Sequence, residues 1–299
     1  MTTFAPATRT ATKARIALSG PSGSGKTYTA LALAHGLGQR VAVIDTERGS
    51  ASKYAGDNGW TFDTVAPGSF SPDSLSSLLA AAAGEGYEVV VVDSLSHYWM
   101  GVDGMLEQAD RLKHGSNSFS GWKEARPAER RMIDALIAYP GHVIVTMRTK
   151  TEYVIEEDAR GKKVPRKVGL KPEQRDGIEY EFDLVGDLDL ENTLVVSKTR
   201  ISALNRAVVP EPGVELAKTI ADWLGSGTAV EDASDLRSLV LADDVTLAEL
   251  TEVGARMNSL GLRAAMVTDA DGTPVQLAAL LTSRWQQLNQ APVAAQGGE

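Results

Sequence analysis

The chain of 299 residues contains no cysteine, which excludes disulfide bonds, thiolate catalysis and thiolate metal sites. Its four histidines, at positions 35, 97, 114 and 142, are scattered without the paired spacing of metal ligands. No apolar run is long enough to cross a membrane, and residues 1–13 lack the apolar stretch of a signal peptide. We therefore expect a cytoplasmic protein with no structural metal and no membrane partner.

Positive charge is also in the minority. The chain has 30 lysines and arginines but 39 aspartates and glutamates, so its formal net charge is −9. This balance argues against a uniformly basic nucleic-acid binder, since attraction to phosphate is the main sequence-independent part of such binding. It does not exclude a local basic path. With 43% hydrophobic residues, the chain can bury one sizeable core and a small second unit.

One glycine-rich string carries the strongest chemical signal. Residues 16–19 read as a buried strand, residues 20–27 read G-P-S-G-S-G-K-T, and residues 28–37 read as a helix. In this pattern backbone N–H groups turn inward around a β-phosphate at the positive end of the helix. A mere glycine-rich turn does not explain the strand before it and the helix after it. The sequence therefore predicts that the chain binds ATP and Mg²⁺.

Each residue of the loop has an expected partner. Lys26 is predicted to reach the β- and γ-phosphates and to act in catalysis, and the Thr27 hydroxyl is predicted to bind Mg²⁺. The full set of expected nucleotide contacts in and beside the loop is Gly20, Pro21, Ser22, Gly23, Ser24, Gly25, Lys26, Thr27 and Tyr28.

Two later strand patterns end in carboxylates. Residues 41–44 lead into Asp45 and Glu47, and residues 89–92 lead into Asp93, the expected Walker B ligand of Mg²⁺. Most AAA+ ATPases place the catalytic glutamate directly after that aspartate, but here Ser94 follows. Because parallel strands end at one edge of a sheet, Glu47 is the candidate base that activates water at the γ-phosphate. The alternative is that Asp45 and Glu47 only cap a solvated strand end.

The loop, the D-x-E strand end and the Asp-Ser strand end together resemble the RecA/RadA recombinase core, over residues 15–224. The resemblance implies an α/β fold with a RecA-like P-loop NTPase core, a mainly parallel sheet flanked by helices. It also implies that Tyr54, seven residues after Glu47, stacks on adenine. Where RecA carries an amide sensor, the strand at 142–147 has Thr146, which we assign to a water near the γ-phosphate.

The strand pattern at 194–201 is similar to the RecA/RadA strand whose paired cations reach the ATP of a neighbouring subunit. The resemblance implies that Lys198 and Arg200 act in catalysis like an arginine finger, and that the chain forms a homo-oligomer, either a ring or a filament. The alternative is that these are two charges on the wet side of an edge strand.

A longer string, K-V-G-L-K-P-x-Q-R-x-G-x-E-Y-E-F-D at residues 167–183, resembles phage and prophage ATP-binding proteins. Those proteins are similar to compact RecA-like single-strand annealing proteins of phages. The resemblance implies single-stranded DNA as partner, a role in recombination or annealing in the cytoplasm of a bacterial host, DNA-stimulated ATP hydrolysis, and other phage or host recombination or replication proteins as further partners.

Two stretches carry cations at the positions where RecA-like cores keep DNA-binding loops. One is an expected irregular stretch at 101–126, ahead of a helix at 128–138, and the other is an expected hairpin with strands at 153–157 and 162–168. Cations beside aromatic rings suit single-stranded nucleic acid, whereas the alternative is a solvated surface of mixed charge. The candidate DNA-binding residues are Trp122, Lys123, Arg160, Lys162, Lys163, Arg166 and Lys167.

The domain organisation follows from changes in composition. We expect a flexible segment at 1–13, the ATPase core at 14–225, a small helical domain at 229–289 and a disordered tail at 290–299. The helical domain should contain helices at 233–241, 246–260 and 275–288. Phe4 begins an F-x-x-A string that resembles the segment joining subunits of RadA-type recombinases.

Two other functions fit a phosphate-binding loop. One is an ATP-switched accessory that binds partners in phage replication or packaging, with little turnover. The other is a P-loop kinase that phosphorylates a small molecule.

Overall fold

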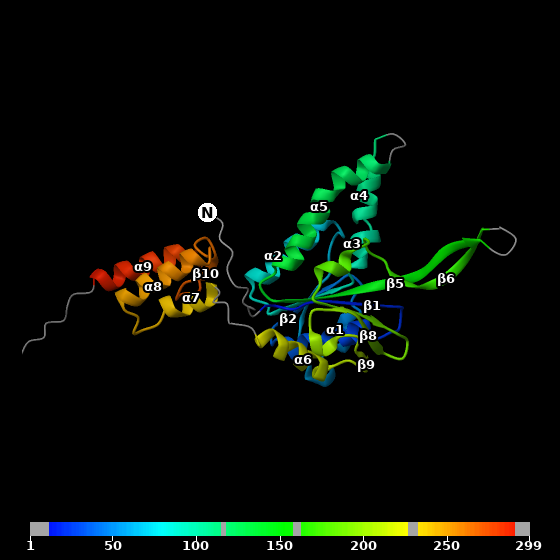
Figure 1. Ribbon diagram of the computed structural model, residues 1–299. Coiled ribbons are helices and arrows are strands. Elements are labelled where there is room, and N and C mark those ends of the chain that lie inside the picture. Colours follow the sequence, from blue (N-terminus) through cyan, green and yellow to red (C-terminus); the bar gives the residue numbers. More distant parts are fainter. Residues whose placement is uncertain (1–11, 115–117, 158–162, 227–232, 291–299) are drawn as a thin grey trace, which may run out of the picture. The chain divides into compact units, whose positions relative to one another are not determined.

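The computed structural model describes residues 12–114, 118–157, 163–226 and 233–290 and contains two compact units, Met1–Gly227 and Thr228–Glu299. The first unit is built on a sheet in the order β3-β2-β4-β5-β1-β7-β8-β9, with β6 paired to β5 beside this path (Figure 1). Its strands are β1 (Arg15–Gly20), β2 (Val41–Asp45), β3 (Asp63–Val65), β4 (Val89–Asp93), β5 (His142–Glu157), β6 (Lys163–Pro172), β7 (Leu184–Leu188), β8 (Thr193–Thr199) and β9 (Val208–Pro210).

The sheet is mixed but mostly parallel. In the order given above, all neighbouring strands between β3 and β7 are parallel to each other. Strand β8 is antiparallel to β7, and β9 is antiparallel to β8. Strand β5 lies between β1 and β4, so the strand that leads into the loop is not adjacent to the strand that ends in Asp93. The predicted α/β fold, a mainly parallel sheet flanked by helices, is confirmed.

Helices cover both faces of this sheet. Helices α1 (Lys26–Leu37) and α6 (Val214–Gly225) pack on one face, against a core that includes Ile16 and Val91. Helices α2 (Pro72–Gly84) and α5 (Ser118–Ala138) pack on the other face, against a core that includes Ala17, Val90 and Val145. The central strands read as continuous apolar runs because their side chains are buried on both sides.

Strand β5 is longer than the sequence predicts. The change from Met147 to Arg148 indicates a strand end, but β5 continues to Glu157 because β6 pairs with it from Thr149 onward. The expected hairpin is therefore confirmed in its strands, and Figure 1 shows it leaving the sheet as a long ribbon. Residues 158–162, which include Arg160 and Lys162, lie outside the described residues.

The expected irregular stretch at 101–126 is wrong. Short helices α3 (Ser96–Met100) and α4 (Met105–Arg111) lie near its start, and α5 already begins at Ser118. Proline disfavours a helix interior because it lacks an N–H, so the sequence predicts a start after Pro127. A small apolar cluster that includes Met105, Ala109 and Ala125 stabilises the helix before that proline.

The second unit contains α7 (Ala233–Val240), α8 (Leu247–Ser259) and α9 (Leu277–Gln290), with a short pair of strands, β10 (Met266–Thr268) and β11 (Pro274–Gln276). Thr246 caps α8 through a capping box with Glu249. The helix predicted from residue 275 begins at Leu277 because β11 pairs with β10. The F-x-x-A string, residues 227–232 around the predicted domain boundary and residues 291–299 of the predicted tail lie outside the described residues.

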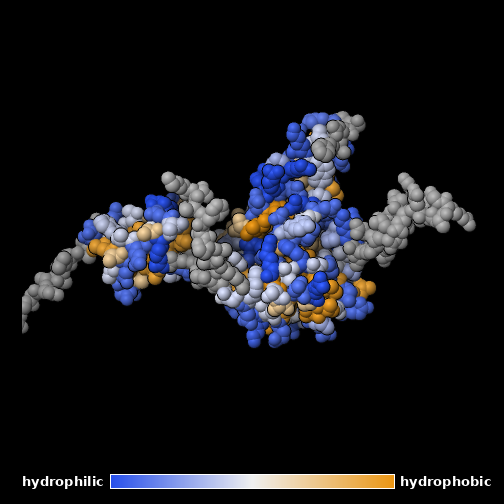
Figure 2. Space-filling view, in the orientation of Figure 1, coloured by the Kyte–Doolittle hydropathy of each residue, from blue (hydrophilic) through white to orange (hydrophobic). Residues whose placement is uncertain are grey.

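The surface in Figure 2 is mostly hydrophilic, with separated apolar patches. Within the part of the chain that is described, no helix has the length and apolar character that crossing a membrane requires.

Candidate nucleotide site

The loop between β1 and α1 can adopt its path only with glycine at several positions. Gly23 and Gly25 have φ angles of +84° and +81°, which other residues rarely adopt. A Cβ atom at Gly20 would lie 2.5 Å from the Ser24 Oγ and 2.6 Å from the carbonyl oxygen of Leu188. The Ser24 Oγ is buried and has no hydrogen-bond partner among the described residues. The loop thus forms a tight backbone cradle at the amino end of α1, as phosphate binding requires.

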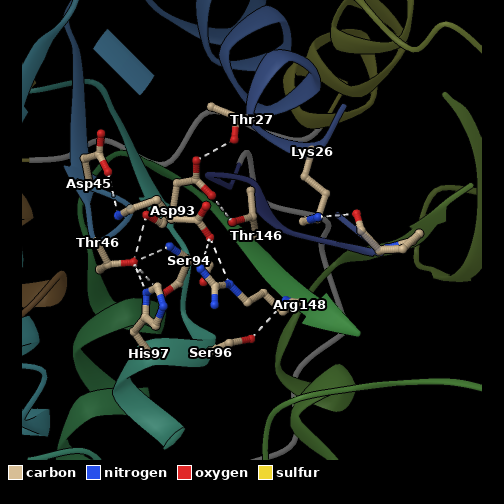
Figure 3. Close-up of polar contacts among 12 residues, drawn as sticks. Lys26, Thr27, Asp45, Thr46, Asp93, Ser94, Ser96, His97, Thr146 and Arg148 are labelled. Carbon is tan, nitrogen blue, oxygen red and sulfur yellow. Dashed lines mark hydrogen bonds and ion pairs between the residues drawn. The ribbon is translucent and has the colours of Figure 1, made fainter. Parts of the chain in front are cut away.

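The first two residues of α1 point to opposite partners (Figure 3). Lys26 Nζ donates to the carbonyl of Pro21 at 2.7 Å, back across the loop. The Thr27 hydroxyl donates to Asp93 Oδ2 at 2.6 Å, and the Thr146 hydroxyl donates to the other oxygen of the same carboxylate. Asp93, predicted from the end of β4, therefore lies directly beside the loop.

Burial shifts the pKa values of Asp93 and Lys26. Burial raises the pKa of Asp93, while the hydrogen bonds from Thr146 and Thr27 act in the opposite direction. Burial lowers the pKa of Lys26, although Asp93 and Glu47 attract its charge. The Lys26 ammonium group and the Thr27–Asp93 pair therefore lie on the same edge of the sheet. Phosphates bind an ammonium group, and a hard divalent cation binds hydroxyl and carboxylate oxygens.

Asp45 and Glu47 play different parts at the end of β2. The Asp45 carboxylate accepts hydrogen bonds from the backbone N–H groups of Glu47 at 2.7 Å and Ala51 at 3.0 Å, so it caps the turn, as the alternative interpretation proposed. Glu47 does not act as a cap, because its Oε1 lies 3.0 Å from both Nε and a terminal nitrogen of Arg148. The turn held by Asp45 presents Glu47 on the edge that carries the loop.

Thr46 ties the end of β2 to the end of β4. Its hydroxyl accepts from the Ser94 N–H at 2.7 Å and lies 2.5 Å from His97 Nδ1 (Figure 3). Burial lowers the pKa of His97, and the positive charge of Arg148 lowers it further. These contacts hold the two carboxylate-bearing strand ends in a defined register.

An aromatic cluster lies beside the first turn of α1. The rings of Tyr28 and Tyr54 are 5.9 Å apart, and Trp60 lies 5.1 Å from Tyr28. The Asn58 side chain donates to the Tyr28 hydroxyl at 3.1 Å. The structure therefore brings together the two tyrosines that the sequence assigns to the nucleotide, and it adds Trp60 and Asn58, which no sequence motif marks.

Lys198 and Arg200 are not close to the loop of their own chain. Strand β8 runs antiparallel to β7, so Lys198 pairs with Val185 at the level of Ala17, roughly 10 Å before the end of β1. Arg200 forms an ion pair with Asp183 at 2.7 Å. Lys198 donates to the backbone carbonyls of residues 179, 180 and 182. Both cations therefore lie toward the edge of the sheet opposite the loop.

The candidate DNA-binding residues divide into two groups. Trp122 packs on Trp99 with ring centroids 5.4 Å apart, and Lys123 is exposed on α5. Lys163, Arg166 and Lys167 lie on β6, where the structure describes the backbone alone. The other two candidates, Arg160 and Lys162, lie outside the described residues.

Residues 12–208, more than half of the sequence, match the protein family described as AAA domain. The chain belongs to this AAA domain family. No curated protein matches the chain. The family supports a P-loop ATPase that binds and hydrolyses nucleotide, and it implies ATP with Mg²⁺ as ligands. The glycine cradle, the unpartnered Ser24 hydroxyl and the Thr27–Asp93 pair fit those ligands.

Arg148 is a further site residue of this AAA domain that sequence reasoning missed. It occurs in the Thr146-Met147-Arg148 string, but it is one of many arginines in a chain of 30 basic residues. Only the pairing of β1 with β5 places it beside Gly20 at the start of the loop. The sequence carries no motif that would mark this position.

Proposed function

We propose that this AAA domain protein is a RecA-like ATPase that binds single-stranded DNA in phage recombination or annealing, in the cytoplasm of a bacterial host. One observation carries the ATPase mechanism. The carboxylate of Glu47 comes from the end of β2 and lies on the edge that bears Lys26 and Asp93, whereas the residue after Asp93 is Ser94. A carboxylate at that place suits a general base, as the D-x-E pattern predicts.

Each polar group of the site has a role in this mechanism. Bound ATP and its Mg²⁺ supply the phosphoryl group and a cation that withdraws negative charge from it. Thr27 and Asp93 would hold the metal, and Lys26, which donates to the Pro21 carbonyl in this structure, would donate to the phosphates. Thr146 fixes the orientation of the Asp93 carboxylate. Glu47 orients the attacking water and accepts its proton. Tyr28 and Tyr54 give a flat aromatic surface for adenine.

Lys198 and Arg200 serve a neighbouring subunit in this proposal. Their position toward the opposite edge of the sheet keeps them from the loop of their own chain, so they reach ATP only in a homo-oligomer, as a ring or filament provides. Delivery to a neighbour requires that Arg200 exchange its ion pair with Asp183 for phosphate. Assembly and hydrolysis are thereby coupled.

Single-stranded DNA contacts two separate elements in this proposal. The β5–β6 hairpin supplies cations for phosphates from Lys163, Arg166 and Lys167, together with Arg160 and Lys162 of its turn. Helix α5 supplies Trp122 for stacking against a base. A groove of about 710 Å³ runs along α5 beside Trp99 and Trp122, but acids as well as arginines line it. We therefore assign base stacking to α5 and phosphate contacts to the hairpin.

The test is binding of labelled single-stranded and double-stranded oligonucleotides with and without ATP, together with ATP hydrolysis with and without DNA. Nucleotide-dependent preference for the single strand, with stimulated hydrolysis, is expected for the wild-type chain and not for Lys26→Ala. ATP binding without DNA binding and with little turnover would instead favour the ATP-switched accessory of phage replication or packaging.

An open cavity next to β1 favours a second candidate, a small-molecule kinase. It measures about 390 Å³, and Ser19, Asp187, Lys171 and Arg175 are among its lining residues. A cavity that offers such polar groups beside the strand that leads into a phosphate-binding loop can hold a small acceptor. Phosphorylation of metabolites by the monomer, measured by mass spectrometry with a metabolite mixture, would support this function over the first.

A further inference from the structure

The ion pair between Glu47 and Arg148 places two guanidinium nitrogens on one carboxylate oxygen. Both Nε and a terminal nitrogen of Arg148 lie 3.0 Å from one oxygen of Glu47, Oε1. Glu47 follows the end of β2, and Arg148 lies in β5. Because β4 separates these two strands in the sheet, Arg148 reaches across the end of the strand that carries Asp93 (Figure 3). The pair thus spans the carboxyl edge where the metal ligands lie.

The backbone of Arg148 is anchored, whereas its side chain is partly exposed to solvent. Its N–H donates to Ser96 Oγ at 2.9 Å, and it pairs in register with Gly20. Its side chain is 42% exposed, against 26% for Glu47. An exposed guanidinium on an anchored backbone can exchange one anion for another without disturbing the core.

Electrostatics couple this pair to the loop. The charge of Arg148 acts with burial to lower the pKa of Lys26, whereas Glu47 acts in the opposite direction. Lys26 and Arg148 are therefore like charges close enough to repel each other, and an anion bound near both relieves that repulsion.

We propose that Arg148 exchanges Glu47 for the terminal phosphate of a bound nucleoside triphosphate, and that this exchange releases Glu47 to act as the base. The inference rests on the proposed ATPase function and deepens it. A terminal phosphate offers several anionic oxygens to the guanidinium fork, which a single carboxylate oxygen does not match. A diphosphate leaves Arg148 on Glu47. Until a triphosphate binds, the carboxylate of Glu47 stays paired with Arg148 and does not act as the base.

The experiment measures affinities rather than turnover. Equilibrium binding of ADP and of a non-hydrolysable ATP analogue, with Mg²⁺, is compared for the wild-type chain, Arg148→Gln and Arg148→Lys. Arg148→Gln should lower the preference for the triphosphate about tenfold or more, the size of a lost charge-assisted hydrogen bond, and leave ADP affinity within about twofold. Arg148→Lys should retain part of the preference because it keeps the charge. Arg131→Gln is the matched control, since Arg131 pairs with Asp73 at 3.1 Å between α5 and α2.

A second measurement separates exchange from simple support of the fold. Glu47→Gln removes the competing anion, so the triphosphate analogue should bind more tightly, by about threefold or more. The gain should vanish in the double variant Glu47→Gln with Arg148→Gln, because the two residues interact directly.

Equal loss of both affinities in Arg148→Gln, or an unchanged preference, would overturn the exchange. Failure of the wild-type chain to bind either nucleotide more tightly than Lys26→Ala would instead overturn the proposed ATPase function itself. Thermal unfolding of each variant shows whether the fold is retained. If Arg148→Gln does not fold, the affinities of Arg148→Lys and Glu47→Gln test the exchange.

Discussion

The hydroxyl of Thr27 donates a hydrogen bond to Asp93 Oδ2 at 2.6 Å, across 66 positions of sequence. Thr27 lies in the first turn of α1 and Asp93 ends β4, so the bond joins the phosphate-binding loop to a strand that is not adjacent to β1. The Thr146 hydroxyl of the intervening strand β5 completes the contact. Three elements of the fold therefore meet at the carboxylate of Asp93.

Binding and hydrolysis should separate between Lys26 and Glu47. Lys26→Ala should lose ATP binding because it removes the ammonium group of the loop. Glu47→Gln should still bind ATP and lose turnover by roughly two or more orders of magnitude, as expected for loss of a general base. Equilibrium binding and steady-state hydrolysis measure the two effects. Near-normal hydrolysis by Glu47→Gln would remove Glu47 as the base.

Lys198→Ala and Arg200→Ala should each depress hydrolysis and leave ATP affinity largely intact. Lys198→Ala subunits retain the base, and Glu47→Gln subunits retain both cations, so mixing them should restore part of the activity at hybrid interfaces. Hydrolysis is measured across a range of protein concentrations, with light scattering in ATP. Activity independent of concentration, with no oligomer, would exclude the contribution from a neighbour.

Neutralising the hairpin should weaken single-strand binding and reduce its salt dependence. Replacement of Lys162, Lys163, Arg166 and Lys167 by glutamine removes up to four phosphate contacts, each worth roughly 0.7 of a log–log slope unit. Affinity is measured between low and moderate salt, with Lys218→Gln as a control from α6. A slope equal to that of the wild-type chain would mean that DNA, if bound, follows another path.

Trp122→Ala should affect DNA binding differently. Loss of a stacking surface should cost roughly 1–3 kcal/mol of binding free energy and leave the salt slope nearly unchanged, because no phosphate contact is removed. Trp285→Ala, in α9 of the second unit, is the control, because Trp285 is an exposed tryptophan that this proposal does not assign to DNA. If both tryptophan variants bind DNA with the wild-type affinity, α5 does not contact a base.

His142 should make folding stability depend on pH. Burial lowers the pKa of His142 to about 4, helped by the charges of Lys13 and Arg15 and opposed by Glu88. Its Nδ1 accepts a hydrogen bond from the Ala14 N–H at 2.9 Å, which only the unprotonated nitrogen can do.

The sign of this effect follows from the direction of the shift. The folded chain favours neutral His142, so the stabilisation is complete above the unfolded pKa and is lost as pH falls from about 6.5 toward 4. Urea unfolding at pH 7.5 and 5.0 should show a decrease in stability that is larger in the wild-type chain than in His142→Gln, by about 2 kcal/mol. Equal decreases in the two proteins would contradict the assignment.

The sequence by itself predicts the parts of the site that are local in the chain. The loop at residues 20–27 is predicted to bind phosphate through consecutive backbone N–H groups, so its sequence pattern can be recognised without knowledge of the fold. Asp93 and Glu47 follow from one further rule, that parallel strands end at a common edge. The predicted fold class is confirmed for the same reason, because buried parallel strands appear as apolar runs.

Tertiary structure decided what depends on strand order and on packing between distant segments. Arg148 reaches Glu47 only because β5 lies beside β4 and β1, and no local pattern encodes that order. Helix α5 begins before Pro127 because Trp99 and Met105 pack near its first turns. Lys198 and Arg200 lie far from the loop because β8 is antiparallel, a direction that a strand's own residues do not specify. Side-chain periodicity reports which faces are buried, whereas the neighbours of a strand and its direction are selected by the packing of the whole sheet.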